Sequence, residues 1–125
     1  MIRVTKEKLG GRVELVVGDA EELPWKDDTF DAVVSSFAFH HFPRPKAALA
    51  ELKRVLKPGG VLIIGDIWLP PPLRQLLNLI IRYSKTGDVR SYSKSEIVSL
   101  LRDGGFNSIH WELVYIVFSV VTARK

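Results

Sequence analysis

Apolar blocks separated by short polar stretches run along this chain, and their composition predicts three strands. The β-branched run at 12–17 ends at a glycine and is typical of a buried strand. A second apolar run, 31–39, follows the polar turn at 26–29. The third, 61–67, is apolar almost throughout, as expected of a strand covered on both faces.

Helical spacing appears between and after these runs. Apolar residues recur at intervals of three and four within 45–57, and Pro58-Gly59-Gly60 is expected to stop that helix. A very apolar helix is predicted at 73–83, behind three prolines. Ser93 and Glu96 have the S-x-x-E spacing of a capping box, which opens another helix. The closing segment contains no turn signal, so it is predicted as one or two strands.

Alternation of strands and helices indicates an α/β domain with a mostly parallel sheet and helices on both faces. In such sheets ligands bind outside the carboxyl ends of the strands. Three polar sites follow predicted strands: Asp19, Ser35-Ser36 and Asp66. By itself the stretch "GDAEELPW", from Gly18 to Trp25, has two interpretations, a solvated turn or a ligand-facing strand end. The coincidence of three such sites favours the second.

Composition narrows the class of protein. The 125 residues are 46% hydrophobic and 26% charged, which fits one globular domain at 1–125. No cysteine is present, so disulfides and cysteine-based metal sites are excluded, and no metal site is predicted. The apolar runs are too short to cross a bilayer, which takes ~20 residues. With no signal-peptide pattern, a cytoplasmic protein without a membrane partner is expected.

The net charge of +4 raises the question of a nucleic-acid partner. The eighteen lysines and arginines are scattered and interleaved with acids, and no basic run contains aromatic residues. Direct nucleic-acid binding is therefore not expected.

Several segments together resemble class I S-adenosylmethionine-dependent methyltransferases, in particular the small-molecule enzymes related to those of ubiquinone and menaquinone biosynthesis. The block of strand, "LKPGG" and strand is the most specific of them, and it occurs here together with "GDAEELP". The matching stretches are "VELVVGDAEELPW", "TFDAVVSSFAFHHFPRPKAALAELKRVLKPGGVLIIGD", "RSYSKSEIVSLLRDGGF" and "VVTARK". The resemblance implies a Rossmann-like sheet whose last strand is antiparallel, with S-adenosyl-L-methionine as cofactor.

The resemblance also implies roles for residues at the strand ends. Asp19 would accept a hydrogen bond from the adenine amino group, and the backbone N–H of Ala20 would reach the neighbouring ring nitrogen. A carboxylate beside an N–H is complementary to that edge of adenine. Ser36 and Phe37 would lie along the methionine part of the cofactor.

Two histidines follow in the loop that would border both cofactor and acceptor. His40 or His41 could remove a proton from a hydroxyl or an enolisable carbon, because imidazole titrates near neutral pH. The alternative is that the pair is partly exposed and only packs at a helix entry. Asp66 would sit near the acceptor, or would simply bond local backbone.

The glycine-rich loop typical of this family is not found. Only Gly10 and Gly11 precede Gly18, and the opening 1–9 resembles the helix that follows the family's second strand. Met1 then corresponds to an internal methionine, and we expect an N-terminally truncated domain that lacks its first two strands. Two functions are therefore possible. The chain transfers a methyl group to a small-molecule acceptor, with an activity impaired by its short length, or it is a non-catalytic fragment that serves in association.

Two expectations concern partners. The broad apolar face of the helix at 73–83 favours an apolar or amphiphilic acceptor, or a packing partner. Without its neighbour the strand at 31–39 would expose a pairing edge, which soluble proteins avoid. Either the strand at 12–17 moves inward to pair with it, or a second chain covers it. A homodimer is expected, with an interface at 1–17.

Overall fold

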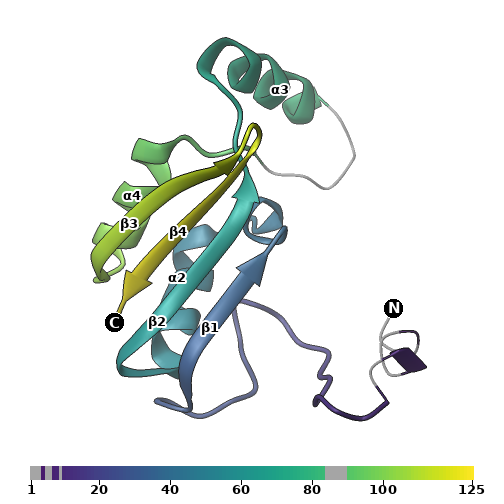
Figure 1. Cartoon of the computed structure of the whole chain (residues 1–125), viewed down its shortest axis with the longest axis vertical. Helices are drawn as coiled ribbons and strands as arrows, with labels where there is room; N and C mark the ends of the chain where they lie inside the picture. The colour runs from purple at the N-terminus through teal and green to yellow at the C-terminus, as the bar shows by residue number, and fades with distance from the viewer. Residues whose placement is uncertain (1–3, 5–6, 9, 84–89) are drawn as a thin grey trace.

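The structure, a computed structural model, describes residues 4, 7–8, 10–83 and 90–125 (Figure 1). The helix expected at 1–9 lies largely outside these residues. The elements, in chain order, are β1 (Phe30–Ser36), the 3-10 helix η1 (Phe39–His41), α2 (Pro45–Val55), β2 (Leu56–Ile67), α3 (Pro71–Tyr83), α4 (Lys94–Asp103), β3 (Asn107–Tyr115) and β4 (Phe118–Arg124).

The strands form one mixed sheet. Its order is β1-β2-β4-β3, with β1 parallel to β2 and both later pairs antiparallel. The α/β class and the antiparallel last strand are thus confirmed. The expectation of a mostly parallel sheet is wrong for the described residues, since β2 pairs with β4, and β4 with β3, in the antiparallel direction. The closing segment is two strands, because a turn at Ile116-Val117 folds it into a hairpin.

The hydrophobic core lies between the sheet and two helices. Alternate residues of β2 and β4, including Leu62, Ile64 and Val121, are buried against α2 and α4. Leu49 of α2 and Leu101 of α4 are almost completely buried in the same cluster. This packing aligns the carboxyl ends of β1 and β2 at one edge of the sheet.

Two predictions from local sequence, the capping box at Ser93 and the helix stop at Pro58-Gly59-Gly60, have different outcomes in the structure. The capping box is confirmed: Ser93 Oγ accepts from the Glu96 N–H, and the Glu96 carboxylate accepts from the Ser93 N–H. The helix stop predicted at Pro58-Gly59-Gly60 is wrong, because α2 already ends at Val55 and β2 begins at Leu56. Gly59 does take a left-handed backbone, with φ +77°, but it lies where the register between β1 and β2 shifts rather than in a helix cap.

The strand predicted at 12–17 is wrong for this structure. Residues 12–17 have no regular secondary structure, and Val17 is 83% exposed. A β-branched run becomes a strand only when a neighbour supplies ladder hydrogen bonds. Among the described residues β1 pairs with β2 alone, so the inward movement of this run is also wrong.

The helix predicted at 73–83 forms as α3, at one end of the molecule (Figure 1). None of its residues is buried. Across the described residues, no helix is both long enough and apolar enough to cross a membrane.

Candidate functional site

The candidate site lies where β1 and β2 end side by side. Ser36 is in register with Gly65, and the Phe37 N–H donates to the Gly65 carbonyl at 2.9 Å. The chain then turns sharply, since Phe37 has φ +52°, and enters η1. Asp66 follows Gly65 directly within β2, so the last residues of both strands meet at this edge, as the sequence predicted for Ser36 and Asp66.

His40 and Asp66 form the closest polar pair at this edge. His40 Nδ1 lies 2.5 Å from Asp66 Oδ1, and the His40 backbone N–H donates to Asp66 Oδ2 at 2.9 Å. Both side chains are mostly shielded, with 15% and 14% of their surface exposed. The carboxylate therefore holds the imidazole by its ring and by its backbone.

Burial of Phe39 positions this pair. Phe39 is 1% exposed and packs against Phe42 and Tyr92, with ring centroids 5.5 Å apart in each case. The 3-10 turn then closes through the Phe42 N–H and the Phe39 carbonyl. Because the preceding residue is locked in the core, the His40 side chain has little freedom to leave Asp66.

His41 has a different environment. Its ring lies 4.0 Å from that of His40, but its side chain is exposed, and Asp66 bonds His40. The sequence treated the two histidines as equivalent, and the structure distinguishes them. It also makes Asp66 a partner of His40, which the sequence did not indicate.

A small cavity of about 20 Å³ lies beside the His40–Asp66 pair. Apart from these two residues and Ser119, its walls are apolar or aromatic and include Tyr92 and Trp111. Burial raises the pKa of the Tyr92 hydroxyl above its ordinary value, with a smaller opposing effect from Arg90. Tyr92 therefore remains a neutral hydrogen-bonding group at physiological pH.

Ser36 and Phe37 are both exposed at the end of β1. The Phe37 ring stacks on that of Phe118, with centroids 4.9 Å apart and planes 29° apart. Gly65 lies under Phe118, since a Cβ there would come within 2.8 Å of the ring. An aromatic surface thus lies next to the strand ends.

Asp19 and Ala20 lie in a tight turn. The Glu22 N–H donates to the Asp19 carbonyl at 3.0 Å, and Asp19 Oδ1 accepts from the Glu21 N–H at 2.8 Å. The turn that the sequence offered as one interpretation is therefore present. Among the described residues, no hydrogen bond joins Asp19 or Ala20 to the strand ends, so the structure does not bring the two predicted parts of the site into contact.

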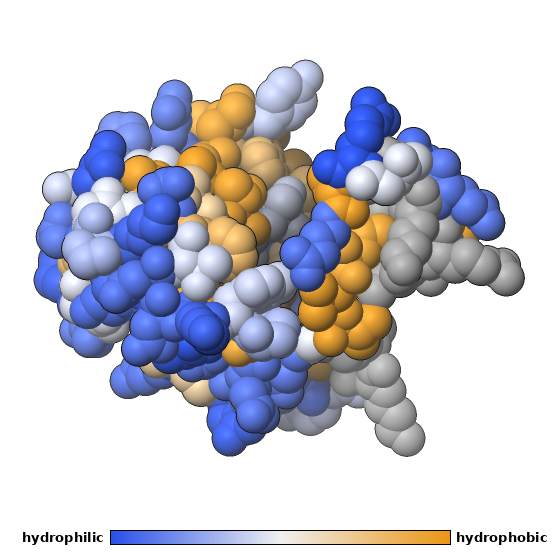
Figure 2. Space-filling model, turned by 90° about the horizontal axis from the view of Figure 1, so that it is seen from below, coloured by the Kyte–Doolittle hydropathy of each residue, from blue (hydrophilic) through white to orange (hydrophobic). Residues whose placement is uncertain are grey.

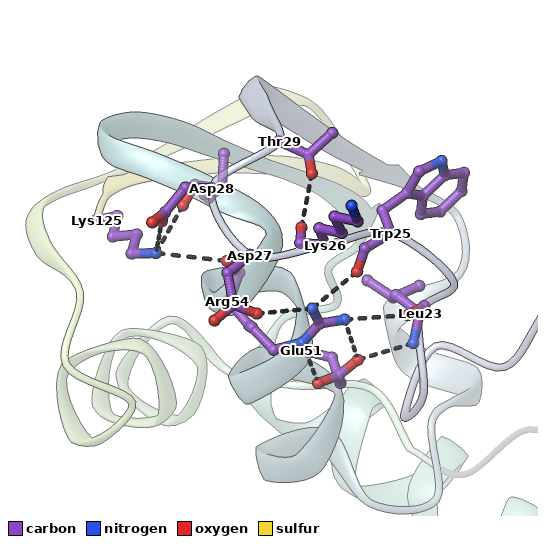
Figure 3. Close-up of polar contacts among 10 residues, drawn as sticks. Leu23, Trp25, Lys26, Asp27, Asp28, Thr29, Glu51, Arg54 and Lys125 are labelled. Atoms are coloured by element: carbon purple, nitrogen blue, oxygen red, sulfur yellow. Dashed lines mark hydrogen bonds and ion pairs between the residues drawn. The ribbon is translucent and has the colours of Figure 1, made fainter.

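A polar network attaches this loop to α2 (Figure 3). Arg54 donates to the carbonyls of Leu23 and Trp25 and to the Asp27 carboxylate, at 2.8–3.0 Å. Glu51 accepts from the Leu23 N–H at 2.8 Å and from Arg54. The bonds from Arg54 and then from Leu23 lower the pKa of Glu51 from 4.5 to about 2.

The sequence did not reveal this network. Glu51 and Arg54 have the i,i+3 spacing of an ordinary surface pair, and their partners lie 27 to 31 residues away.

Within the ranges that the structure describes, no cluster of histidine, aspartate and glutamate could hold a metal ion.

Comparison with known proteins adds the family. Residues 1–64 match the family model described as "Methyltransferase domain", which covers half of the chain. The chain belongs to this methyltransferase family. It is 36% identical over 112 residues to a demethylmenaquinone methyltransferase of Staphylococcus aureus, spanning 86% of this chain and 46% of that protein. The resemblance seen in the sequence, to class I S-adenosylmethionine-dependent methyltransferases, is confirmed.

Solved structures agree on the fold of this methyltransferase domain. A S-adenosylmethionine-dependent methyltransferase from Aquifex aeolicus is 28% identical, with a TM-score of 0.75 over 98% of this chain and 60% of that one. A protein of Bacillus halodurans superposes with a TM-score of 0.79 at 24% identity, over 98% and 76% of the two chains. The family's cofactor is S-adenosyl-L-methionine. The chain spans less than half the length of the curated relatives it matches.

Proposed function

We propose that this chain takes part in methyl transfer from S-adenosyl-L-methionine to a small-molecule acceptor. The observation that carries the proposal is the shielded His40–Asp66 pair, because it puts a potential base at the strand ends where ligands bind in this class of sheet. Family membership supports the choice of cofactor. The absence of cysteine is consistent with a cytoplasmic setting, which is part of the proposal.

The residues that the sequence predicted for cofactor binding have groups that fit the chemistry of that cofactor. Asp19 accepts one local hydrogen bond, and a carboxylate has acceptor sites for more, so it can also receive the adenine amino group. Ala20 would present its backbone N–H to the ring, while Ser36 and Phe37 border the methionine part. When bound, the sulfonium supplies the activated methyl group, and the protein contributes position and shielding from water.

His40 is the proposed base. Asp66 occupies Nδ1, so Nε2 is the ring nitrogen that would exchange a proton with an acceptor hydroxyl or carbon. The carboxylate then stabilises the imidazolium that forms. His41 stays a second candidate, since its ring contacts that of His40, and its side chain is exposed whereas that of His40 is mostly shielded.

The walls next to the pair are apolar and aromatic, and the cavity between them, about 20 Å³, has room for about one water molecule. The apolar acceptor therefore rests on the character of these walls and not on a pocket large enough to hold it. The relative from Staphylococcus aureus is named for a menaquinone precursor, which agrees with this class of compound. We do not extend the proposal to a particular molecule.

Calorimetry with S-adenosylhomocysteine tests the cofactor half of the proposal. We expect weak binding by the isolated chain, because it spans less than half of its curated relatives. Asp19→Ala should abolish it, while Asp31→Ala, an exposed carboxylate at the start of β1, should not change it. Equal affinity of Asp19→Ala and wild type would contradict the assignment, and micromolar binding by wild type would contradict the impairment.

Measurement of methyl-transfer turnover tests the role proposed for His40 as the base. His40→Ala should lower turnover and leave cofactor affinity nearly unchanged, whereas His41→Ala should have the smaller effect. Loss of both properties together in His40→Ala would indicate a binding role instead.

A second proposal, association of two copies, rests on the edge of β1 that no strand of the described residues covers. Val34 of β1 and residues Val13, Val16 and Val17 are exposed, and the hydrophobic surfaces in Figure 2 face each other across a hollow. A homodimer built on 1–17 and this edge would cover them, even in a chain without catalysis. Light scattering that finds a well-folded monomer of 14.1 kDa would contradict it.

A further inference from the structure

The end of the molecule that carries α3 has an exposed apolar surface, separate from the one formed by 12–17 and β1. Five large apolar side chains of α3 are exposed at helical spacing, so they form one stripe along it. They are Leu73, Leu76, Leu79, Ile80 and Tyr83. Surface helices normally turn such a stripe toward the core, and here it faces outward.

Polar contacts explain this orientation. Asn78 donates to the Ser91 carbonyl at 3.1 Å and accepts from the Ser91 N–H at 2.8 Å. Arg74 donates to the Leu69 carbonyl at 2.9 Å. Both side chains lie on the face of α3 opposite the stripe, so the polar face is attached to the body and the apolar face is directed away from it.

The β3–β4 hairpin ends at the same end of the molecule (Figure 1). Its tip is apolar and exposed, with Ile116 81% exposed, although hairpin turns are normally polar. The exposed residues are Leu113, Val114, Tyr115, Ile116 and Val117. The Val117 carbonyl accepts from the Trp68 N–H at 2.9 Å, which ties the tip to the segment that leads into α3.

The charges near this surface favour one class of partner. Over 67–83 and 113–119 the charged residues are Arg74 and Arg82, and Asp66 and Glu112 lie just outside these ranges. Because Arg74 is bonded to the Leu69 carbonyl on the attached face, Arg82 is the cation of α3 beside the apolar stripe. Tyr83 and Tyr115 are among the exposed side chains, and tyrosine is favoured at the boundary between lipid and water. Exposed apolar groups with arginine and tyrosine beside them have the chemistry of a segment that lies in a membrane interface.

We propose that α3 and the tip of the β3–β4 hairpin bind the surface of an anionic phospholipid bilayer. The helix would lie in the interface without crossing it. This departs from the sequence-based expectation of no membrane partner, which considered only spanning segments. A bilayer needs no complementary shape, so one surface accepts a helix and a hairpin together. The proposal is independent of methyl transfer.

Co-sedimentation of the full chain with vesicles tests it. We expect binding to vesicles made of equal parts phosphatidylcholine and phosphatidylglycerol, weakened by salt, and much less binding to phosphatidylcholine alone. Leu76→Glu and Ile116→Glu should each reduce binding by at least about tenfold. Arg82→Gln should reduce it by about fivefold, since one basic residue is lost near the anionic surface.

Matched controls lie away from this end. Ser99→Glu adds the same charge at an exposed position of α4, and Lys26→Gln removes a cation outside the surface; neither should alter binding. Circular dichroism verifies that each variant folds. Absence of binding to the mixed vesicles, equal binding to the neutral ones, or an equal loss in Ser99→Glu would overturn the proposal. Self-association that Ile116→Glu removes, without vesicle binding, would overturn it in favour of a second copy.

Discussion

Asp66 accepts hydrogen bonds from both the backbone N–H and the imidazole of His40, a residue 26 positions earlier in the chain. The backbone bond fixes where η1 begins relative to the end of β2. The ring bond fixes which nitrogen of the histidine faces the strand end. One carboxylate thus determines both the position and the proton arrangement of the candidate base.

Removing that carboxylate should change the tautomer of His40. Because a carboxylate can only accept, Nδ1 of wild-type His40 should carry the hydrogen of this bond. In Asp66→Ala the two tautomers should mix, which ¹⁵N NMR of the imidazole measures. We also expect a loss of about 1–3 kcal/mol in the free energy of unfolding, because the His40 N–H loses its partner. Asp31→Ala is the control, at about 0.5 kcal/mol or less. An unchanged His40 spectrum in Asp66→Ala would contradict the pairing.

Glu51 predicts a specific pH dependence. Its pKa is about 2 in the folded protein and 4.5 ordinarily, so between these values the unfolded state binds more protons. The stabilisation from this group is therefore complete above pH 4.5 and is lost as the pH falls through about 2. Urea unfolding of wild type should lose stability over this window relative to Glu51→Gln. Glu14→Gln, at an exposed position, serves as control; parallel curves for wild type and Glu51→Gln would refute the prediction.

Arg54→Lys should loosen the loop that carries Asp19. The guanidinium donates to several acceptors at once in a planar arrangement, and an ammonium group cannot reproduce it. Hydrogen exchange of the Leu23 amide should accelerate by roughly tenfold, because Glu51 is no longer held in place. Arg102→Lys at the end of α4 should leave the exchange unchanged. Unaltered protection in Arg54→Lys would show that the network does not order the loop.

Gly65→Ala should destabilise the fold through Phe118. The added Cβ would lie 2.8 Å from the ring, so the ring must leave its stack on Phe37. We expect a cost of about 1–3 kcal/mol by urea unfolding. Phe118→Leu in the same chain removes the clash and should recover part of this cost; additive losses in the double variant would contradict the explanation.

Ser93→Ala tests the capping box of α4. Loss of the Oγ acceptor leaves the Glu96 N–H without its partner and should cost about 1 kcal/mol. Ser99→Ala, on the exposed side of the same helix, should cost nothing, since alanine favours helix. Equal melting temperatures for Ser93→Ala and wild type would contradict the role of the cap.

Local patterns were sufficient for most elements. The capping box, the helical spacing within 45–57 and the apolar runs in β1 and β2 depend on neighbouring residues, so the sequence alone predicted α4, α2 and the parallel pair. The motifs around "GDAEELP" and "LKPGG" also indicated the methyltransferase family to which the chain belongs. The roles of Asp19, Ala20, Ser36 and Phe37 in cofactor binding stay predictions.

Tertiary structure decided everything that depends on a distant partner. The run at 12–17 has the composition of a strand, yet no described neighbour supplies its ladder, so it stays irregular. His40 and His41 are equivalent in sequence, and only the end of β2 gives one of them a carboxylate. Periodicity made α3 amphipathic, but the bond between Asn78 and Ser91 determined which face meets solvent. Composition and spacing specify what a segment can form, whereas long-range contacts select its partner and its orientation.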